Sequence, residues 1–271
     1  MHNIIVGFDF SSGSAHAVDL TIDIANRWQR DIRLVYVKAK GEDETPLRAE
    51  IEQRNANVAH LLKGIKLEYV IRQGNVWEEL SKQASEDDAD LVVVGTNGMS
   101  GFQTNWIGKN TYRTIAESPV PVLSVREHFN FNKALENIVV PLDNTLNTRQ
   151  KVPMAAKFAK AFGSTVHILG LYTSDNTGLR QTVDGYVTQV QRFLEKNEIA
   201  SEVKMLEAQK NLTETTLDYA DSVNADMIVI MTEQESRFAN FILGSFAQQM
   251  VHTSNRPILT IRPEDVNGLA K

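Results

Sequence analysis

Short apolar runs alternate with amphipathic segments along the whole chain. The run Leu91 to Gly95 is uniformly apolar rather than alternating, which is typical of a strand buried on both faces of a parallel sheet. The segments between runs carry apolar residues at helical spacing, as at Ala15, Val18, Ile22 and Ala25. Strands alternating with helices of this length indicate a parallel α/β sheet with right-handed crossovers. In the first half the predicted strands are 3–8, 32–37, 66–71, 91–95 and 120–125, and the predicted helices include about 45–64, 76–86 and 109–117.

Two prolines bear on where helices begin. Thr45-Pro46 predicts a helix start with proline at the first helical position. Pro153 falls in the first helix of the second half of the chain, so that this helix either begins near the proline or is kinked there.

The pattern of the first half returns in the second half. N-I-I-V-G-F-D at Asn3 returns as N-I-V-V-P-L-D at Asn137, an offset of 134 residues, and A-D-L-V-V-V-G at Ala89 returns as A-D-M-I-V-I-M at Ala225, an offset of 136. Near-constant offsets over four strands indicate two copies of one α/β unit. The matched positions are Asp9 with Asp143, Val37 with Leu171, Gly95 with Met231, and Pro121 with Pro257. We predict a first domain at 1–126, a linker at 127–135, a second domain at 136–264 and a tail at 265–271.

A glycine-bearing connection joins the strand 91–95 to the helix 109–117 in the first half. It contains Gly95, Gly98, Gly101 and Gly108, and it is longer than most connections of this type. Glycines allow close backbone approach to a ligand, and a helix N-terminus favours anions, so the connection indicates a phosphate site. The alternative is a surface loop whose glycines serve turn geometry.

Charge and composition narrow the classes of function. The 28 basic and 34 acidic residues give a net charge of −6 without long blocks, which argues against nucleic-acid binding. The chain has no cysteine, so thiol catalysis and cysteine-ligated metals are excluded. No window is long and apolar enough to span a membrane, and the first residues lack the pattern of a signal peptide, so we expect a cytoplasmic protein. The six histidines never fall in metal-ligand spacing, and no Walker A motif is present.

With these motifs, both halves resemble the universal stress protein family, and together they resemble its tandem form. ATP-binding members of that family carry Gly, two residues, Gly, nine residues, Gly, then Ser or Thr. The first half has Gly95, Gly98 and Gly108 at that spacing, with Lys109 at the last position. In the second half the first two glycines are replaced by Met231 and Gln234, whereas Gly244-Ser245 remains.

The resemblance implies the fold and the place of the site. It implies two tandem doubly wound α/β domains of the flavodoxin or Rossmann type, each a five-stranded parallel sheet in the order 3-2-1-4-5 with helices on both faces. Ligands bind such sheets at the switch point between strands one and four. By family analogy, Asp9 and Val37 hold the adenosine end of a nucleotide, and the glycine loop with the start of the next helix holds the phosphates. The candidate binding residues are therefore Asp9, Val37, Gly95, Gly98, Gly108, Lys109 and Asn110.

Two of these residues have an alternative interpretation. Asp9 also suits a role as a cap of the turn and helix that follow it. Lys109 is unfavourable beside the positive end of a helix dipole, but it can serve as a point-charge partner of phosphate, or it can be a solvated surface lysine.

Two interpretations from different functional classes follow. The first is a regulatory protein of the stress response that binds ATP or another adenine nucleotide at one competent site in the first domain. Mg²⁺ is a possible companion, although no protein ligands for it are identified, and any ATP hydrolysis would be slow. The second is an interaction module without nucleotide, in which Val120–Arg126 and Arg256–Arg262 pair the two domains as an internal pseudo-dimer. An enzyme of a related nucleotide-binding family lacks a catalytic constellation. A homodimer of the whole chain is a further expectation.

Overall fold

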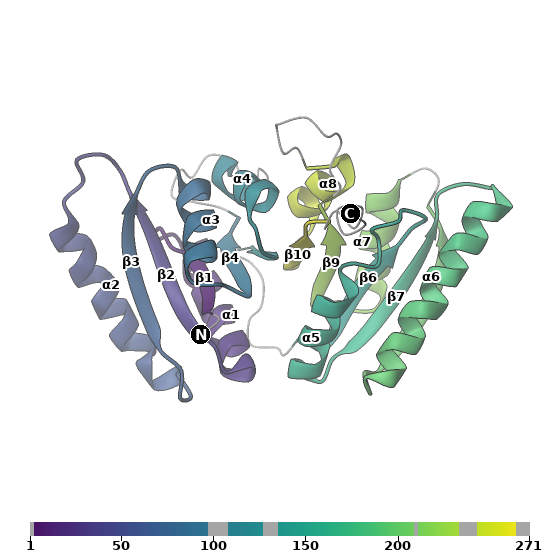
Figure 1. The fold of residues 1–271 in the computed structure, drawn as a ribbon, viewed down its shortest axis with the longest axis horizontal. Helices are drawn as coiled ribbons and strands as arrows, with labels where there is room; N and C mark the ends of the chain where they lie inside the picture. The colour runs from purple at the N-terminus through teal and green to yellow at the C-terminus, as the bar shows by residue number, and fades with distance from the viewer. Residues whose placement is uncertain (1–2, 97–107, 127–134, 209–210, 233–242, 264–271) are drawn as a thin grey trace, which may run out of the picture. The chain divides into compact units, whose positions relative to one another are not determined.

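The computed structural model describes residues 3–96, 108–126, 135–208, 211–232 and 243–263 (Figure 1). The chain divides into two compact units, residues 1–131 (unit 1) and 132–271 (unit 2). The predicted linker at 127–135 and tail at 265–271 fall almost wholly outside the described residues, so these boundaries stay predictions.

Unit 1 is a five-stranded parallel sheet with helices between its strands. The strand order is β3-β2-β1-β4-β5, as predicted. Its elements are β1 (Asn3–Gly7), α1 (Ser12–Trp28), β2 (Asp31–Lys38), α2 (Glu44–Val58), the 3₁₀ turn η1 (Ala59–Leu61), β3 (Leu67–Gln73), α3 (Val76–Glu86), β4 (Leu91–Gly95), α4 (Lys109–Glu117) and β5 (Val122–Val125).

Unit 2 repeats this arrangement with the order β8-β7-β6-β9-β10, all parallel. Each strand pairing keeps the register of its counterpart in unit 1. The prediction of two doubly wound units with the order 3-2-1-4-5 is therefore confirmed. The elements are β6 (Asn137–Leu142), α5 (Val152–Phe162), β7 (Thr165–Tyr172), α6 (Thr177–Lys196), β8 (Ser201–Glu207), α7 (Leu212–Ser222), β9 (Met227–Met231), α8 (Ser245–Thr253) and β10 (Ile258–Ile261).

The central strands are buried because helices cover both faces of each sheet. Leu91, Val92 and Val93 on β4 have no exposed surface, as the uniformly apolar run predicts. A Cβ on Gly95 would point at Gly13 of α1, whereas a Cβ on Gly7 would point at Leu80 of α3. Thus α1 and α3 lie on opposite faces of the sheet of unit 1.

The sequence predicted where two helices begin, at Pro46 and at Pro153, and one of these two predictions was wrong. α2 begins at Glu44, because Asp43 is its N-cap and accepts a hydrogen bond from Thr45 N (3.0 Å). The prediction that Pro46 is the first helical residue was therefore wrong, since it is the third. In unit 2, α5 begins at Val152 with Pro153 in its first turn, so of the two alternatives the helix begins at the proline.

Across the part of the chain that the structure describes, no helix combines the length and apolar character needed to cross a membrane.

Candidate functional site

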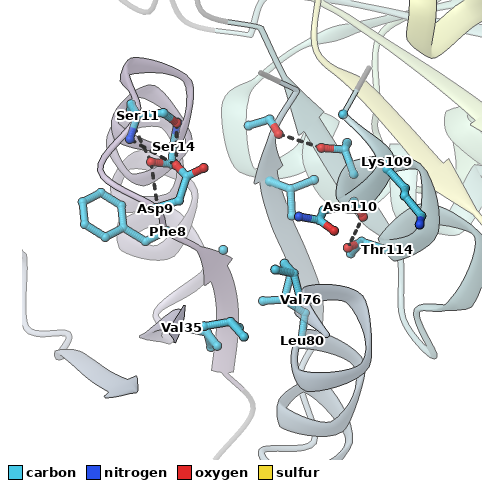
Figure 2. Close-up of a pocket in the computed structure, with 16 residues that line it drawn as sticks. Phe8, Asp9, Ser11, Ser14, Val35, Val76, Leu80, Lys109, Asn110 and Thr114 are labelled. Atoms are coloured by element: carbon cyan, nitrogen blue, oxygen red, sulfur yellow. Dashed lines mark hydrogen bonds between the residues drawn. The ribbon is translucent and has the colours of Figure 1, made fainter. Parts of the chain in front are cut away.

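A cavity of about 410 Å³ lies at the carboxyl ends of β1 and β4 in unit 1. The strand order of the sheet reverses between these two strands, which is where ligands bind in open α/β sheets. Figure 2 shows side chains of α3, α4 and the β1–α1 turn on opposite sides of this crevice. The lining residues are Gly7, Phe8, Asp9, Ser11, Ser14, Val35, Val37, Val76, Leu80, Val94, Gly95, Gly108, Lys109, Asn110, Thr111 and Thr114.

Asp9 lies in the turn between β1 and α1 and has a structural role there. Its Oδ1 accepts hydrogen bonds from Ser11 N (3.1 Å) and Ser11 Oγ (2.5 Å) (Figure 2). Ser11 is the N-cap of α1, and its Oγ accepts from Ser14 N (3.2 Å). Both of these bonds use Oδ1, and within the described residues no hydrogen bond to Oδ2 is found, so Oδ2 can accept from a ligand. Asp9 therefore caps the turn and borders the cavity at once, and its two interpretations do not exclude each other.

Aromatic packing fixes the backbone on either side of Asp9. Phe10 has φ +61°, a left-handed conformation that is uncommon outside glycine. Its ring packs between Phe8 (centroids 4.9 Å apart) and Tyr36 (5.3 Å). Burial, followed by the hydrogen bond to Glu42 and nearby carboxylates, raises the pKa of Tyr36 to about 12, so the phenol stays protonated. The turn that presents Asp9 is thus held by a neutral aromatic cluster.

One wall of the cavity is apolar and partly bare backbone. Val35, Val37 and Val94 contribute from the strands, and Leu80 contributes from α3. Gly7 has no side chain here, and a Cβ on it would stand 3.3 Å from both Leu80 and Val94. The missing Cβ lets Leu80 and Val94 lie close to the β1 backbone, and the apolar wall that results suits a flat apolar group.

Another side of the cavity is formed by the N-terminus of α4. Gly108 is the N-cap and supplies no side-chain acceptor, so no side chain of the described residues caps the first-turn N–H groups. The Thr111 hydroxyl donates to Gly95 O (2.9 Å), which ties α4 to the end of β4. Lys109 and Asn110 are exposed at this end of the helix. An uncapped helix N-terminus with an adjacent lysine favours an anionic group.

Gly95 is required for packing between β4 and α1. A Cβ at Gly95 would lie 2.6 Å from Gly13 C, 2.8 Å from Gly13 O and 2.8 Å from Ser14 N. These are backbone atoms of the first turn of α1, so no side chain fits while that turn keeps its place. The glycine thus lets α1 begin directly against the crevice.

Among the described residues, unit 2 has almost no cavity at the equivalent place. The space is about 20 Å³, roughly enough for one water molecule. Met231 stands where unit 1 has Gly95, and Phe246 stands where unit 1 has Asn110. The helix α5 begins at Val152, six residues later than the counterpart of the α1 start. The residues around the remaining space are Pro141, Asp143, Thr145, Thr148, Lys151, Leu171, Leu212, Met231 and Phe246.

Lys151 occupies part of the space that the later helix start creates. Its side chain is buried, and Nζ donates to Thr148 O (2.6 Å) and lies 3.2 Å from Thr148 Oγ1. The turn before it repeats unit 1, because Thr145 N and Oγ1 donate to Asp143 Oδ1 (3.0 and 2.6 Å). The turn at the strand end is therefore retained in unit 2, whereas the cavity is not.

Six of the seven residues predicted from the sequence line the cavity of unit 1. These six are Asp9, Val37, Gly95, Gly108, Lys109 and Asn110. Gly98 lies outside the described residues, as does Gln234 in unit 2. Gly7, Val76 and Leu80 are among the lining residues that sequence reasoning missed. The glycine in place of Pro141 of the second copy was a signal for the first of these, whereas Val76 and Leu80 carried none.

Among the described residues, no group of three or more His, Cys, Asp or Glu side chains is placed to hold a metal ion.

The fold and its crevice define the class of protein. Each unit is a doubly wound α/β domain, and unit 1 has an open crevice at the switch point between β1 and β4. The family model of the universal stress protein family matches residues 1–126 and 134–262. The chain therefore belongs to the universal stress protein family, in a form with two such domains in tandem.

Individual relatives agree with this assignment. The universal stress protein YxiE of Bacillus subtilis is 25% identical over 146 residues, covering 46% of this chain and 99% of that protein. A universal stress protein of Thermus aquaticus is 31% identical over 86 residues, covering 31% of this chain and 63% of that protein. The crystal structure of a universal stress protein from Archaeoglobus fulgidus matches with a TM-score of 0.73, 19% identity and 97% coverage of both chains. At that identity the likeness is one of fold.

Proposed function

We propose that this protein is a regulatory member of the universal stress protein family that binds an adenine nucleotide, ATP or a relative of it, at one site in unit 1. The observation that carries the proposal is the pairing, in one cavity of about 410 Å³, of an apolar wall with an uncapped helix N-terminus. A nucleotide has the same division, since its base is flat and largely apolar and its phosphates are anionic.

The base and ribose would lie against Gly7, Val35 and Val37, with Asp9 Oδ2 as a hydrogen-bond acceptor. Asp9 Oδ1 is already engaged by Ser11, so the carboxylate is oriented before any ligand arrives. An acceptor held in place by the protein costs less to order on binding.

The phosphates would lie at the N-terminus of α4, near Gly108, Lys109 and Asn110. The helix offers free N–H groups and the positive end of its dipole, and Lys109 adds a cation. The role of Gly98 in the same loop stays a prediction from its spacing to Gly95 and Gly108.

Unit 2 would bind no nucleotide. Its space of about 20 Å³ holds no base, and the side chains of Lys151, Met231 and Phe246 stand where the crevice of unit 1 is open. This filled crevice favours a second candidate function for unit 2, that of an interaction module. Pairing of the two units through their last strands, and a homodimer of the whole chain, remain predictions that light scattering and crosslinking of the intact protein can test.

The first experiment identifies any nucleotide that co-purifies with the intact protein. Freshly purified protein is denatured, and the released small molecules are separated and identified by mass spectrometry. We expect one adenine nucleotide per chain, or its uptake by calorimetry when the protein is isolated empty. An empty protein that binds neither ATP nor AMP would refute the proposal. Two nucleotides per chain would refute the closed state of unit 2.

The matched variants Asp9→Ala and Asp143→Ala separate binding from turn structure. Both carboxylates hold the same kind of turn, to Ser11 in unit 1 and to Thr145 in unit 2. Loss of the turn should therefore destabilise both variants alike, but only Asp9→Ala should weaken nucleotide binding, by tenfold or more. Equal nucleotide affinity in the two variants would contradict a ligand role for Asp9.

A further inference from the structure

The two units differ in a polar cluster at the amino ends of their strands, the end of the sheet that lies away from the crevice. In unit 1 the cluster is built on a permanent ion pair. Arg33 on β2 donates from Nε to Asp87 (3.0 Å) and from Nη1 to Glu68 on β3 (2.7 Å). Burial opposes the charge of Asp87, but hydrogen bonds from Arg33, Asn3 and Gln83 outweigh it and lower the pKa of Asp87.

In unit 2 the same positions carry a neutral, titratable group. His167 on β7 replaces Arg33, and Val223 replaces Asp87, while Glu202 keeps the place of Glu68. His167 is only 5% exposed, and its ring packs edge-on against Tyr219 of α7. The replacement therefore exchanges a fixed charge for one that depends on pH.

The contacts of His167 suit the neutral ring. Nε2 lies 3.0 Å from Asn137 Oδ1 on β6, which can only accept, so Nε2 carries a hydrogen. Nδ1 is then the acceptor, 3.4 Å from the Tyr219 hydroxyl. A second proton on Nδ1 would remove that acceptor and place a charge beneath α7.

The surrounding charges do not compensate for a buried imidazolium. Glu202 on β8 lies 3.5 Å from Nδ1, but its side chain is 68% exposed. Asp226, just before β9, accepts from Glu136 N and Asn137 N, and Asp221 at the end of α7 pairs with Arg256. Burial lowers the pKa of His167 although Glu202 acts to raise it, and Tyr219 stays neutral because burial and Glu202 raise its pKa.

We propose that His167 is a pH-sensitive contact between β7 and α7, so that acidification loosens α7 in unit 2 while its counterpart α3 in unit 1 stays in place. The other end of α7 borders the closed crevice of unit 2. Leu212 of α7 lines the remaining space there, and the Thr213 hydroxyl donates to Gln249 of α8 (2.9 Å). The proposal is independent of nucleotide binding in unit 1.

Proton linkage determines the direction in which pH changes the stability of this contact. The pKa of His167 is lower in the folded protein than the ordinary 6.5, so the unfolded or open state takes up the proton first as the pH falls. The stabilising effect of the neutral ring is complete above that value and is lost as the pH falls through the lowered pKa. Each unit by which the pKa is lowered corresponds to about a tenfold larger open population at low pH.

Hydrogen exchange of the intact protein tests this directly. Exchange is followed by mass spectrometry at about pH 7.5 and about pH 5.5, the range in which histidine titrates, and is corrected for the intrinsic pH dependence. We expect opening of α7 to increase at the lower pH by up to about tenfold, because pH 5.5 lies about one unit below the ordinary histidine pKa of 6.5. Peptides from α3 are the control within the same molecule and should not change. Absence of any extra opening in α7 would overturn the proposal.

Two variants assign the effect to His167. His167→Gln keeps a donor toward Asn137 but does not titrate, so α7 should lose its pH dependence. His60→Gln, at an exposed position in unit 1, is the control and should behave as the wild type. Persistence of the pH effect in His167→Gln would refute the assignment. If that variant fails to fold, an NMR titration of His167 in the wild type decides, since a pKa at or above 6.5 would equally refute it.

Discussion

Gly95→Ala should destabilise unit 1 through the backbone of α1. The added Cβ would lie 2.6 Å from Gly13 C, which is 0.8 Å short of ordinary contact at 3.4 Å, and 2.8 Å from Gly13 O and Ser14 N. None of these atoms belongs to a flexible side chain, so the first turn of α1 has to move as a body. Overpacking of this kind costs about 1–3 kcal/mol.

The displaced turn is also the one that holds the candidate site. Ser14 donates from N to Ser11 Oγ, and Ser11 donates to Asp9, so movement of α1 moves the carboxylate. We therefore expect Gly95→Ala to lower the melting temperature of unit 1 by several degrees, at about 2–4 °C per kcal/mol for a protein of this size. Nucleotide affinity should fall with it.

The assay is thermal and urea unfolding of the ligand-free protein, followed by calorimetry with ATP. Gly108→Ala is the matched control, because its Cβ would meet nothing closer than Thr96 O at 3.7 Å and its φ of −58° is ordinary. We expect it to change stability by no more than about 1 kcal/mol, the scale of an N-cap substitution. A Gly95→Ala protein as stable as the wild type, or a Gly108→Ala protein equally damaged, would refute the steric argument.

Two further predictions concern single side chains. Lys109→Ala should weaken binding of ATP about two- to fivefold and slightly stabilise the ligand-free protein, because a cation at a helix N-terminus is unfavourable beside the dipole until an anion binds. Calorimetry measures the affinity and melting curves measure the stability. A variant with unchanged affinity and unchanged stability would contradict the phosphate role of Lys109. Gly185→Ala should stabilise unit 2 by about 1 kcal/mol, because Gly185 lies within α6 and its Cβ would meet nothing within 4 Å. Urea unfolding measures the change in stability. A less stable variant would contradict the conclusion that the Cβ has room.

Local pattern predicted most of the elements and the repeat, although the helix predicted to reach about residue 64 ends at Val58. The segments Val76–Glu86, Leu91–Gly95 and Lys109–Glu117 begin and end where the sequence pattern predicts. The reason is that strand burial, helical periodicity and proline are local properties. The start of α2 was misplaced because Asp43 caps the helix two residues before the position that Pro46 indicated. Family resemblance, added to the same residues, gave the sheet order.

The sequence by itself determined which residues stand at the ends of strands. The family resemblance added the sheet order, which brings Asp9, Val37 and Gly95 together at one cavity. Only the tertiary structure decided what surrounds them. The apolar wall includes Val76 and Leu80 because α3 packs across β1, a contact that no short-range pattern records.

The fate of the second crevice was also a tertiary matter. Replacement of Gly95 by Met231 showed in the sequence that the second site is altered, but not how the chain accommodates the change. α5 begins later than its counterpart, and Lys151 is buried in the space that results. These shifts depend on packing between segments about eighty residues apart, so the closed state of unit 2 follows from how its side chains fill space rather than from any motif.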